Sequence, residues 1–118
     1  MRLVSFTAAA LITALSGCKP QRPIELNPDP TPTGPGEVII YDYKYFPPTL
    51  TVPAGTKVTW RNRDVAPHTA TYRSYGDEAF DSGSMGHLAT FSNKFKTAGS
   101  YSYLCIFHQG MQGTVVVQ

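Results

Sequence analysis

Three residues near the carboxyl end of the chain carry soft or nitrogen metal donors at short, regular spacing. Cys105, His108 and Met111 are each separated by two residues, in the pattern C-x-x-H-x-x-M, and another histidine, His68, lies upstream. A thiolate and two imidazoles in a trigonal set, with a weak axial thioether, form the ligand set of a blue-copper electron-transfer site. If the fold brings His68 to the other three, the chain has this chemistry available.

None of these residues indicates a metal site when it is considered alone. A single cysteine in a strand is usually a small buried hydrophobic side chain, and a single methionine usually fills a core. The spacing changes this interpretation, because a short loop that follows a strand ending at Cys105 returns His108 and then Met111 to the same point. We therefore predict one bound copper ion per chain.

Residues near the predicted ligands are candidates for holding them in place. Pro67 restricts the backbone before the upstream histidine, and the backbone N–H of Thr69 could donate a hydrogen bond to the sulfur of Cys105. Such outer contacts orient ligands and tune a metal. Asn62 or Asp64 could brace the same loop, although turn formation is the preferred interpretation for both.

Short apolar runs separated by turn residues predict the elements that position these side chains. Val58 and Trp60 share one face of an alternating run, so we expect Trp60 in the core. Tyr101, Tyr103 and Cys105 likewise share a face, and Tyr101 follows a glycine turn, which makes it a candidate tyrosine corner. Strands are expected over residues 38–41, 49–52, 57–62, 69–72, 90–96, 101–105 and 113–117, with a long loop over 73–87.

This series of short strands and turns predicts an all-β domain, built as a Greek-key β-sandwich or small barrel. Loops cluster at the ends of such sandwiches, which is how His68 and the loop after Cys105 could meet. The alternation of Tyr41, Tyr43 and Tyr45 is most simply one face of a strand.

Composition limits the class of protein. The 118 residues suffice for one small domain, and the net charge is only +2 at pH 7. No cluster of basic residues is present to neutralise phosphates, so we expect no nucleic-acid partner. We expect a monomer. His87, the third histidine, falls in a glycine-rich segment without ligand spacing and is expected to be an exposed loop residue.

The first residues have the composition of an export signal. Arg2 provides a positive start, and the uncharged apolar stretch Leu3–Leu15 is too short to span a bilayer. The following Ser-Gly-Cys completes a motif that resembles the lipobox of bacterial lipoproteins, in which the signal is removed before the cysteine and that cysteine is lipidated. We expect residues 1–17 to be the signal peptide and Cys18 to carry the lipid. An ordinary secretory signal is the alternative.

The remaining residues divide into a tether and a domain. Residues 18–36 are rich in proline and nearly free of large apolar side chains, which favours an extended linker. Residues 37–118 are expected to form the folded domain. A lipid on Cys18 would hold that domain on the periplasmic or cell-surface side of a bacterial membrane.

Residues 37–118 resemble the cupredoxins, the small blue copper proteins that include plastocyanin and amicyanin. The resemblance implies the cupredoxin form of the Greek-key fold, with His68, Cys105 and His108 as equatorial copper ligands and Met111 as the axial ligand. The short spacing between His108 and Met111 is similar to that of amicyanin, but Gln109 stands where proline is usual, which affects loop rigidity. The resemblance rests on four stretches, 46–55, 58–69, 80–83 and 99–113.

The same resemblance implies a one-electron carrier that cycles between Cu(II) and Cu(I) as it serves exported redox partners. In this family the ring edge of His108 would be the electron port. Phe107, Pro67, Ala66 and Met85 would form an apolar rim around it, and a small rim suits a transient partner.

Other functions fit the sequence less well. Copper enzymes of the oxidase or nitrite reductase type need a second, histidine-rich copper site, and one histidine beyond the two predicted ligands cannot build it. We therefore expect no enzyme. A periplasmic copper-binding or carrier protein is the alternative, but that role favours exposed, methionine-rich or multi-thiol ligands. A purely structural module is disfavoured by the complete ligand set.

Overall fold

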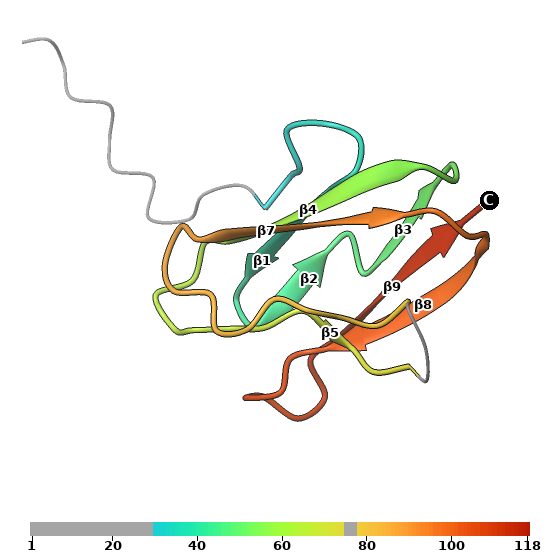
Figure 1. The fold of residues 1–118 in the computed structure, drawn as a ribbon. Helices are drawn as coiled ribbons and strands as arrows, with labels where there is room; N and C mark the ends of the chain where they lie inside the picture. The colour runs from blue at the N-terminus through green and yellow to red at the C-terminus, as the bar shows by residue number, and fades with distance from the viewer. Residues whose placement is uncertain (1–29, 75–77) are drawn as a thin grey trace, which may run out of the picture.

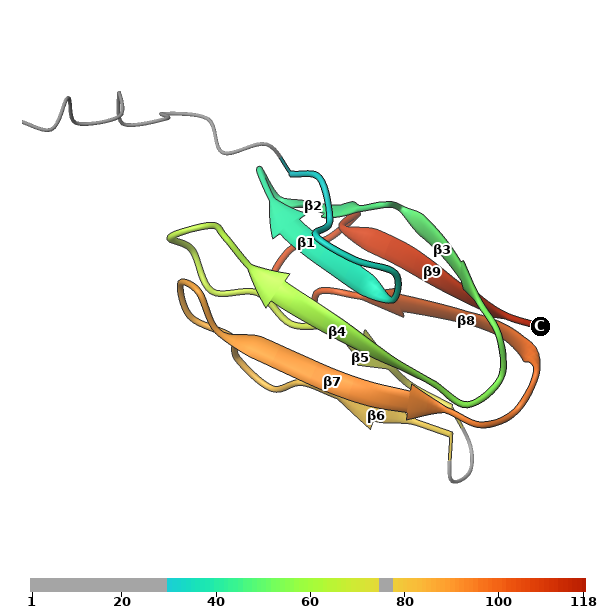
Figure 2. The same ribbon diagram turned by 90° about the horizontal axis from the view of Figure 1, so that it is seen from above.

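The computed structural model describes residues 30–74 and 78–118, which form two β-sheets (Figures 1 and 2). The four-stranded sheet has the order β2-β1-β4-β7, with β1 Glu37–Tyr41, β2 Lys44–Phe46, β4 Thr56–Asn62 and β7 Thr90–Phe95. The five-stranded sheet has the order β3-β9-β8-β5-β6, with β3 Thr49–Val52, β9 Gln112–Val117, β8 Gly99–Leu104, β5 Thr71–Tyr72 and β6 Phe80–Asp81. The predicted all-β sandwich is confirmed.

Two parallel strand pairs determine which strand ends meet. β1 is parallel to β4 and β3 is parallel to β9, whereas the other pairs are antiparallel. β1 and β4 therefore end at the same edge of their sheet. In the second sheet Leu104, the last residue of β8, pairs with Gln112, the first residue of β9. The loops that follow β1, β4 and β8 meet at one end of the sandwich.

The core between the sheets is largely aromatic. Trp60 is fully buried, as predicted, and its ring contacts those of Phe80, Phe95 and Tyr103. On β8 the alternation also holds, because Tyr101 and Tyr103 are buried while their neighbours are exposed. The hydroxyl of Tyr101 donates a hydrogen bond to the carbonyl of residue 97 over 2.6 Å, which is the contact expected of a tyrosine corner.

Close packing between β8 and β9 requires a glycine. Gly113 lies directly opposite Tyr103 in the antiparallel pair, and both residues are buried. A Cβ atom at position 113 would lie 2.4 Å from the hydroxyl oxygen of Tyr103 and 2.5 Å from its Cζ. The missing side chain therefore provides the space in which the Tyr103 ring lies.

Two predicted elements differ from those observed. The strand predicted over 69–72 covers only β5, because the backbone N–H of Thr69 donates to a cysteine sulfur instead of to a neighbouring strand. The long loop predicted over 73–87 contains β6, which pairs with β5, and an isolated bridge between Met85 and His68. Both differences arise from hydrogen bonds to segments that lie outside the predicted element.

The prediction that Tyr41, Tyr43 and Tyr45 share one strand face is wrong. β1 ends at Tyr41, β2 begins at Lys44, and Asp42 and Tyr43 form the turn between them with φ angles of 50° and 58°. Tyr43 therefore lies in the turn and not on a strand face, and it is 50% exposed.

The segment before β1 is hydrogen-bonded to the sheet. The carboxylate of Glu37 accepts hydrogen bonds from the backbone N–H and the hydroxyl of Thr33, and the carbonyl of Gly36 accepts one from the N–H of Thr59. The predicted signal peptide and Cys18 lie outside the described residues. Within the described ranges there is no helix that is long and apolar enough to cross a membrane.

Candidate metal centre

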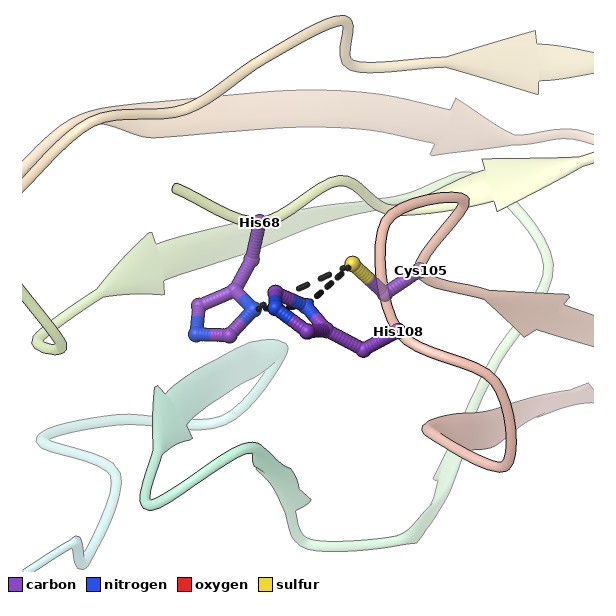
Figure 3. Close-up of side chains that lie close together, drawn as sticks. All are labelled: His68, Cys105 and His108. Atoms are coloured by element: carbon purple, nitrogen blue, oxygen red, sulfur yellow. Dashed lines mark hydrogen bonds between the residues drawn. The ribbon is translucent and has the colours of Figure 1, made fainter. Parts of the chain in front are cut away.

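Three of the four predicted ligand side chains converge at the end of the sandwich where the loops meet (Figure 3). His68 lies on the segment between β4 and β5, Cys105 directly follows β8, and His108 lies in the loop before β9. The sulfur of Cys105 is 3.8 Å from Nδ1 of His68 and 3.3 Å from Nδ1 of His108. The two Nδ1 atoms are 3.1 Å apart.

These distances are suitable for one small metal ion. A point equidistant from the three donor atoms lies about 2 Å from each of them, and metal bonds in zinc proteins measure about 2.0–2.1 Å to imidazole nitrogen and about 2.3 Å to thiolate sulfur. A thiolate and two imidazoles are also donors that copper accepts. The donor set therefore fits a copper ion in both chemistry and spacing.

The three donor side chains differ in their exposure to solvent. His68 is fully buried and Cys105 is 2% exposed, whereas His108 is partly exposed. An ion held by these donors would thus be shielded by protein, and the ring of His108 is the ligand that extends toward the surface.

The backbone around Thr69 holds the cysteine sulfur. Its N–H donates to the sulfur of Cys105 over 3.4 Å, as predicted. Its hydroxyl oxygen accepts a hydrogen bond from the N–H of Ile106 over 3.0 Å, and its carbonyl accepts one from the hydroxyl of Tyr45. Burial raises the pKa of Tyr45, so this phenol remains a donor. Thr69 is thereby fixed from three directions.

His68 is oriented by a carboxylate on its far side. Its Nε2 lies 2.7 Å from Oδ2 of Asp64 and donates to it, which leaves the Nδ1 lone pair directed at the other donor atoms. Burial lowers the pKa of His68 despite the opposing effect of the Asp64 carboxylate. The neutral imidazole that metal binding requires is therefore favoured.

Asp64 also binds the turn between β1 and β2. Its carboxylate accepts hydrogen bonds from the backbone N–H groups of Asp42 and Tyr43, over 2.8 and 2.9 Å. Burial acts to raise the pKa of this carboxyl, but the hydrogen bonds from Tyr43, Asp42 and His68 outweigh it and lower the pKa. A charged carboxylate with three donors thus connects the turn to His68.

Asn62 joins two loops, so turn formation alone does not describe its role. Its fully buried side-chain amide donates to the carbonyls of Ala66, Met85 and Gly86 over 2.9, 2.9 and 3.2 Å. Its oxygen accepts the N–H of Asp64 over 2.9 Å, which is the expected turn contact. The amide therefore braces the segment before His68, as the alternative interpretation proposed.

The loop from Cys105 to Met111 is closed by its own backbone. The N–H of Cys105 donates to the carbonyl of Met111 over 3.1 Å, and the N–H groups of His108 and Met111 donate back along the loop. Met111 is 5% exposed, while Gln109 is exposed. The loop thus returns Met111 to the level of Cys105, as the spacing predicted.

The apolar rim differs from the prediction. Met85 is 3% exposed, because it exchanges backbone hydrogen bonds with His68 in a two-residue bridge, and it cannot line the surface. Phe107 is 49% exposed as expected, and Val65, which was not predicted, is 85% exposed. His87 is exposed, as predicted, with Nδ1 3.0 Å from the carbonyl oxygen of Asp64.

Sequence reasoning missed Tyr43 as a neighbour of the site. Its ring centroid is 5.1 Å from that of His68 and 4.7 Å from that of His108. The only local signal was Asp42, a residue that tolerates positive φ, between two β-type runs.

Comparisons with known proteins agree with this site. Residues 37–118 match the family model described as copper binding proteins of the plastocyanin/azurin family. Amicyanin-alpha of Methylorubrum extorquens is 33% identical over 120 residues, which cover 100% of both chains. Amicyanin of Paracoccus versutus is 36% identical over 77 residues, which cover 64% of this chain and 58% of that protein.

A solved structure gives the same result. The Cu(I) form of an amicyanin variant superposes with a TM-score of 0.67 at 37% identity, covering 75% of this chain and 86% of the other. A family match across the whole sandwich, together with a donor set that fits copper, decides the identity. The chain belongs to the plastocyanin/azurin family of copper-binding proteins, the cupredoxins, and it is a type 1 copper electron-transfer protein.

Proposed function

We propose that His68, Cys105, His108 and Met111 hold the single type 1 copper, with Met111 as the weak axial ligand. The convergence of one sulfur and two imidazole nitrogens around a common point carries this assignment. Bound copper supplies a one-electron Cu(II)/Cu(I) couple. The buried position of Met111 at the end of the closed ligand loop supports its inclusion.

The surrounding residues favour electron transfer by keeping the donors fixed. Thr69 holds the sulfur of Cys105, Asp64 orients His68, and Asn62 braces the loop between them. Because each contact is made within the protein and not to the metal, these contacts would limit the rearrangement of the donors when an electron enters or leaves.

We propose that electrons pass through the ring of His108 to partners that dock transiently around it. His108 is the partly exposed donor. Phe107, the residue before it, and Val65, in the loop after β4 at the same end of the sandwich, have exposed apolar side chains. A small apolar patch favours weak, short-lived complexes with redox proteins. The proposed partners are exported proteins, because the chain carries the sequence features of a lipoprotein signal.

Carriage of electrons is favoured over carriage of the metal itself and over catalysis. Ready exchange of a metal needs accessible ligands, but Cys105 and His68 are almost wholly buried. Among the residues that the structure describes, His68, Cys105 and His108 are the one cluster of histidine, cysteine or acidic side chains that could hold an ion. We therefore propose that the chain is a carrier without a second copper site for catalysis.

An optical spectrum tests the ligand assignment. Copper(II)-loaded protein should show an intense visible absorption band from charge transfer between Cys105 and the metal, and Cys105→Ser should abolish it. His87→Ala serves as the matched control, because this exposed histidine lies outside the site and its loss should leave the band unchanged. An unaltered spectrum for Cys105→Ser would refute the assignment.

A second measurement separates the two carrier roles. Voltammetry should give a reversible one-electron couple, and a copper chelator should remove the ion only slowly from the folded protein. Rapid release of copper to the chelator, without a reversible couple, would favour the metal-carrier alternative instead.

A further inference from the structure

The turn between β1 and β2 has an unusual sequence for its backbone geometry. Asp42 and Tyr43 both have positive φ angles, which is the geometry of a two-residue type I′ hairpin turn. Aspartate is common at the first of these positions and glycine at the second, where tyrosine is sterically disfavoured. The structure therefore maintains Tyr43 in a backbone conformation that the residue does not prefer.

The carboxylate of Asp64 compensates for this geometry. It accepts the N–H groups of both turn residues, Asp42 and Tyr43, and it also accepts Nε2–H of His68. Because one carboxylate makes all three contacts, the position of the turn is fixed relative to the imidazole of His68.

The turn presents the Tyr43 ring to both histidines of the site. The ring is nearly perpendicular to that of His68, at 89°, and to that of His108, at 88°. The two imidazoles are tilted by 56° to each other, with centroids 4.7 Å apart. One aromatic ring therefore contacts both nitrogen ligands and constrains the angle between them.

The same ring borders the solvent. Half of the Tyr43 side chain is exposed, and Tyr43 lines a shallow surface pocket of about 190 Å³ with Gly110 and Met111 among its other walls. Tyr43 thus borders this pocket and contacts the two imidazoles. Replacing it with a small side chain would give water access to the histidines from the pocket.

We propose that Tyr43 is a positioning residue of the copper centre, whose ring fixes the relative orientation of His68 and His108 and shields them from water on the side of this pocket. This inference rests on the proposed ligand set. It predicts that the ring, and not its hydroxyl, matters, because the contacts are between ring planes.

The test compares Tyr43→Leu, which removes the ring, with Tyr43→Phe, which keeps it. Tyr72→Leu is the matched control, because Tyr72 is another half-buried tyrosine whose ring contacts Phe80 and Tyr101. Tyr43→Met provides a second ring-free variant if the leucine variant does not fold. Cu(I) affinity is measured by competition with a chelator, and histidine ring proton shifts are measured by NMR on the copper-free protein.

Loss of the ring should lower the copper affinity by about tenfold, the smaller end of the range for residues that orient ligands. It should also shift the ring protons of both His68 and His108, because the aromatic ring current is lost. Tyr43→Phe should match the native protein in both measurements. Tyr72→Leu should lower the unfolding temperature and leave the copper affinity unchanged.

Three results would overturn the proposal: native copper affinity in the ring-free variants, equal losses in Tyr43→Phe, or an equal loss in Tyr72→Leu. The first would remove the positioning role, the second would assign it to the hydroxyl, and the third would attribute it to general stability. The NMR shifts need no metal, so they test the ring contact even if the copper ligands are others than those proposed.

Discussion

Glu37 is a buried carboxylate whose hydrogen bonds hold the segment before β1. It accepts two hydrogen bonds from Thr33 and one from Nε of Arg61, which lies 3.4 Å away. Burial acts to raise the pKa of Glu37, but the hydrogen bonds from Thr33 and the nearby Arg61 outweigh burial and lower the pKa. The charged form is therefore bound more favourably in the folded state than in the unfolded chain.

Glu37→Gln should reduce the free energy of unfolding of the copper-free protein by about 1 kcal/mol at pH 7. A lowered carboxyl pKa stabilises the fold above the unfolded pKa, and this contribution disappears as the pH falls through the folded pKa. In urea denaturation, the difference between the native protein and the variant should therefore begin to shrink as the pH falls below about 4.3, the ordinary pKa of glutamate, and should vanish at lower pH. A difference that stays constant with pH would argue against the charged carboxylate as its source.

Thr33→Val tests the same contact from the other side. It removes the hydroxyl donor, so it should reproduce part of the loss, and its effect should be smaller in the Glu37→Gln background than in the native protein. Simple addition of the two effects would mean that the two residues act independently.

At the scale of elements, the pairing of β8 with β9 depends on the space above Gly113. Gly113→Ala should destabilise the protein by about 1–3 kcal/mol, because the new Cβ would overlap the ring of Tyr103 and the close-packed core resists such overpacking. Gly34→Ala is the control, since a Cβ there meets nothing within 4 Å. Urea denaturation measures both variants, and equal stabilities would contradict the close packing described for this strand pair.

The alternation of apolar and polar residues was sufficient to predict the strands in which buried and exposed side chains alternate in the same way. The alternation around Trp60 and around Tyr103 identified β4 and β8 and their inward faces, and the proximity of Cys105 to a strand end predicted the ligand loop. Each of these signals can be read from a short stretch of sequence. Successive side chains of a strand point to opposite faces, so a strand with one buried face shows the alternation directly.

Residues whose environment comes from distant segments could not be predicted in the same way. The residues around Met85 are those of an exposed loop, yet Met85 is buried and forms a β-bridge with His68. Tyr43 matched a strand alternation, and only the hydrogen bonds from the turn to Asp64 explain its left-handed backbone.

At the scale of the whole molecule, the attachment to a membrane through a lipid on Cys18 stays a prediction. Full-length protein expressed with its signal should enter the detergent phase in a phase-separation assay, because two or more acyl chains anchor a protein stably. Cys18→Ser should move it to the aqueous phase. The control is Cys105→Ser, which changes the other cysteine of the chain and should leave the partition unaltered. Native protein found only in the aqueous phase would refute the anchor.

The direction of β9 also determines how the protein can be attached to other materials. The strand begins at Gln112, beside the ligand loop, and ends at Val117, so the carboxyl terminus lies at the opposite end of the sandwich (Figures 1 and 2). Five steps along a strand span about 17 Å. A protein immobilised on an electrode through Gln118 would present its metal centre to the solution, free to meet diffusing partners, while direct current from the electrode would have to cross the length of the sandwich.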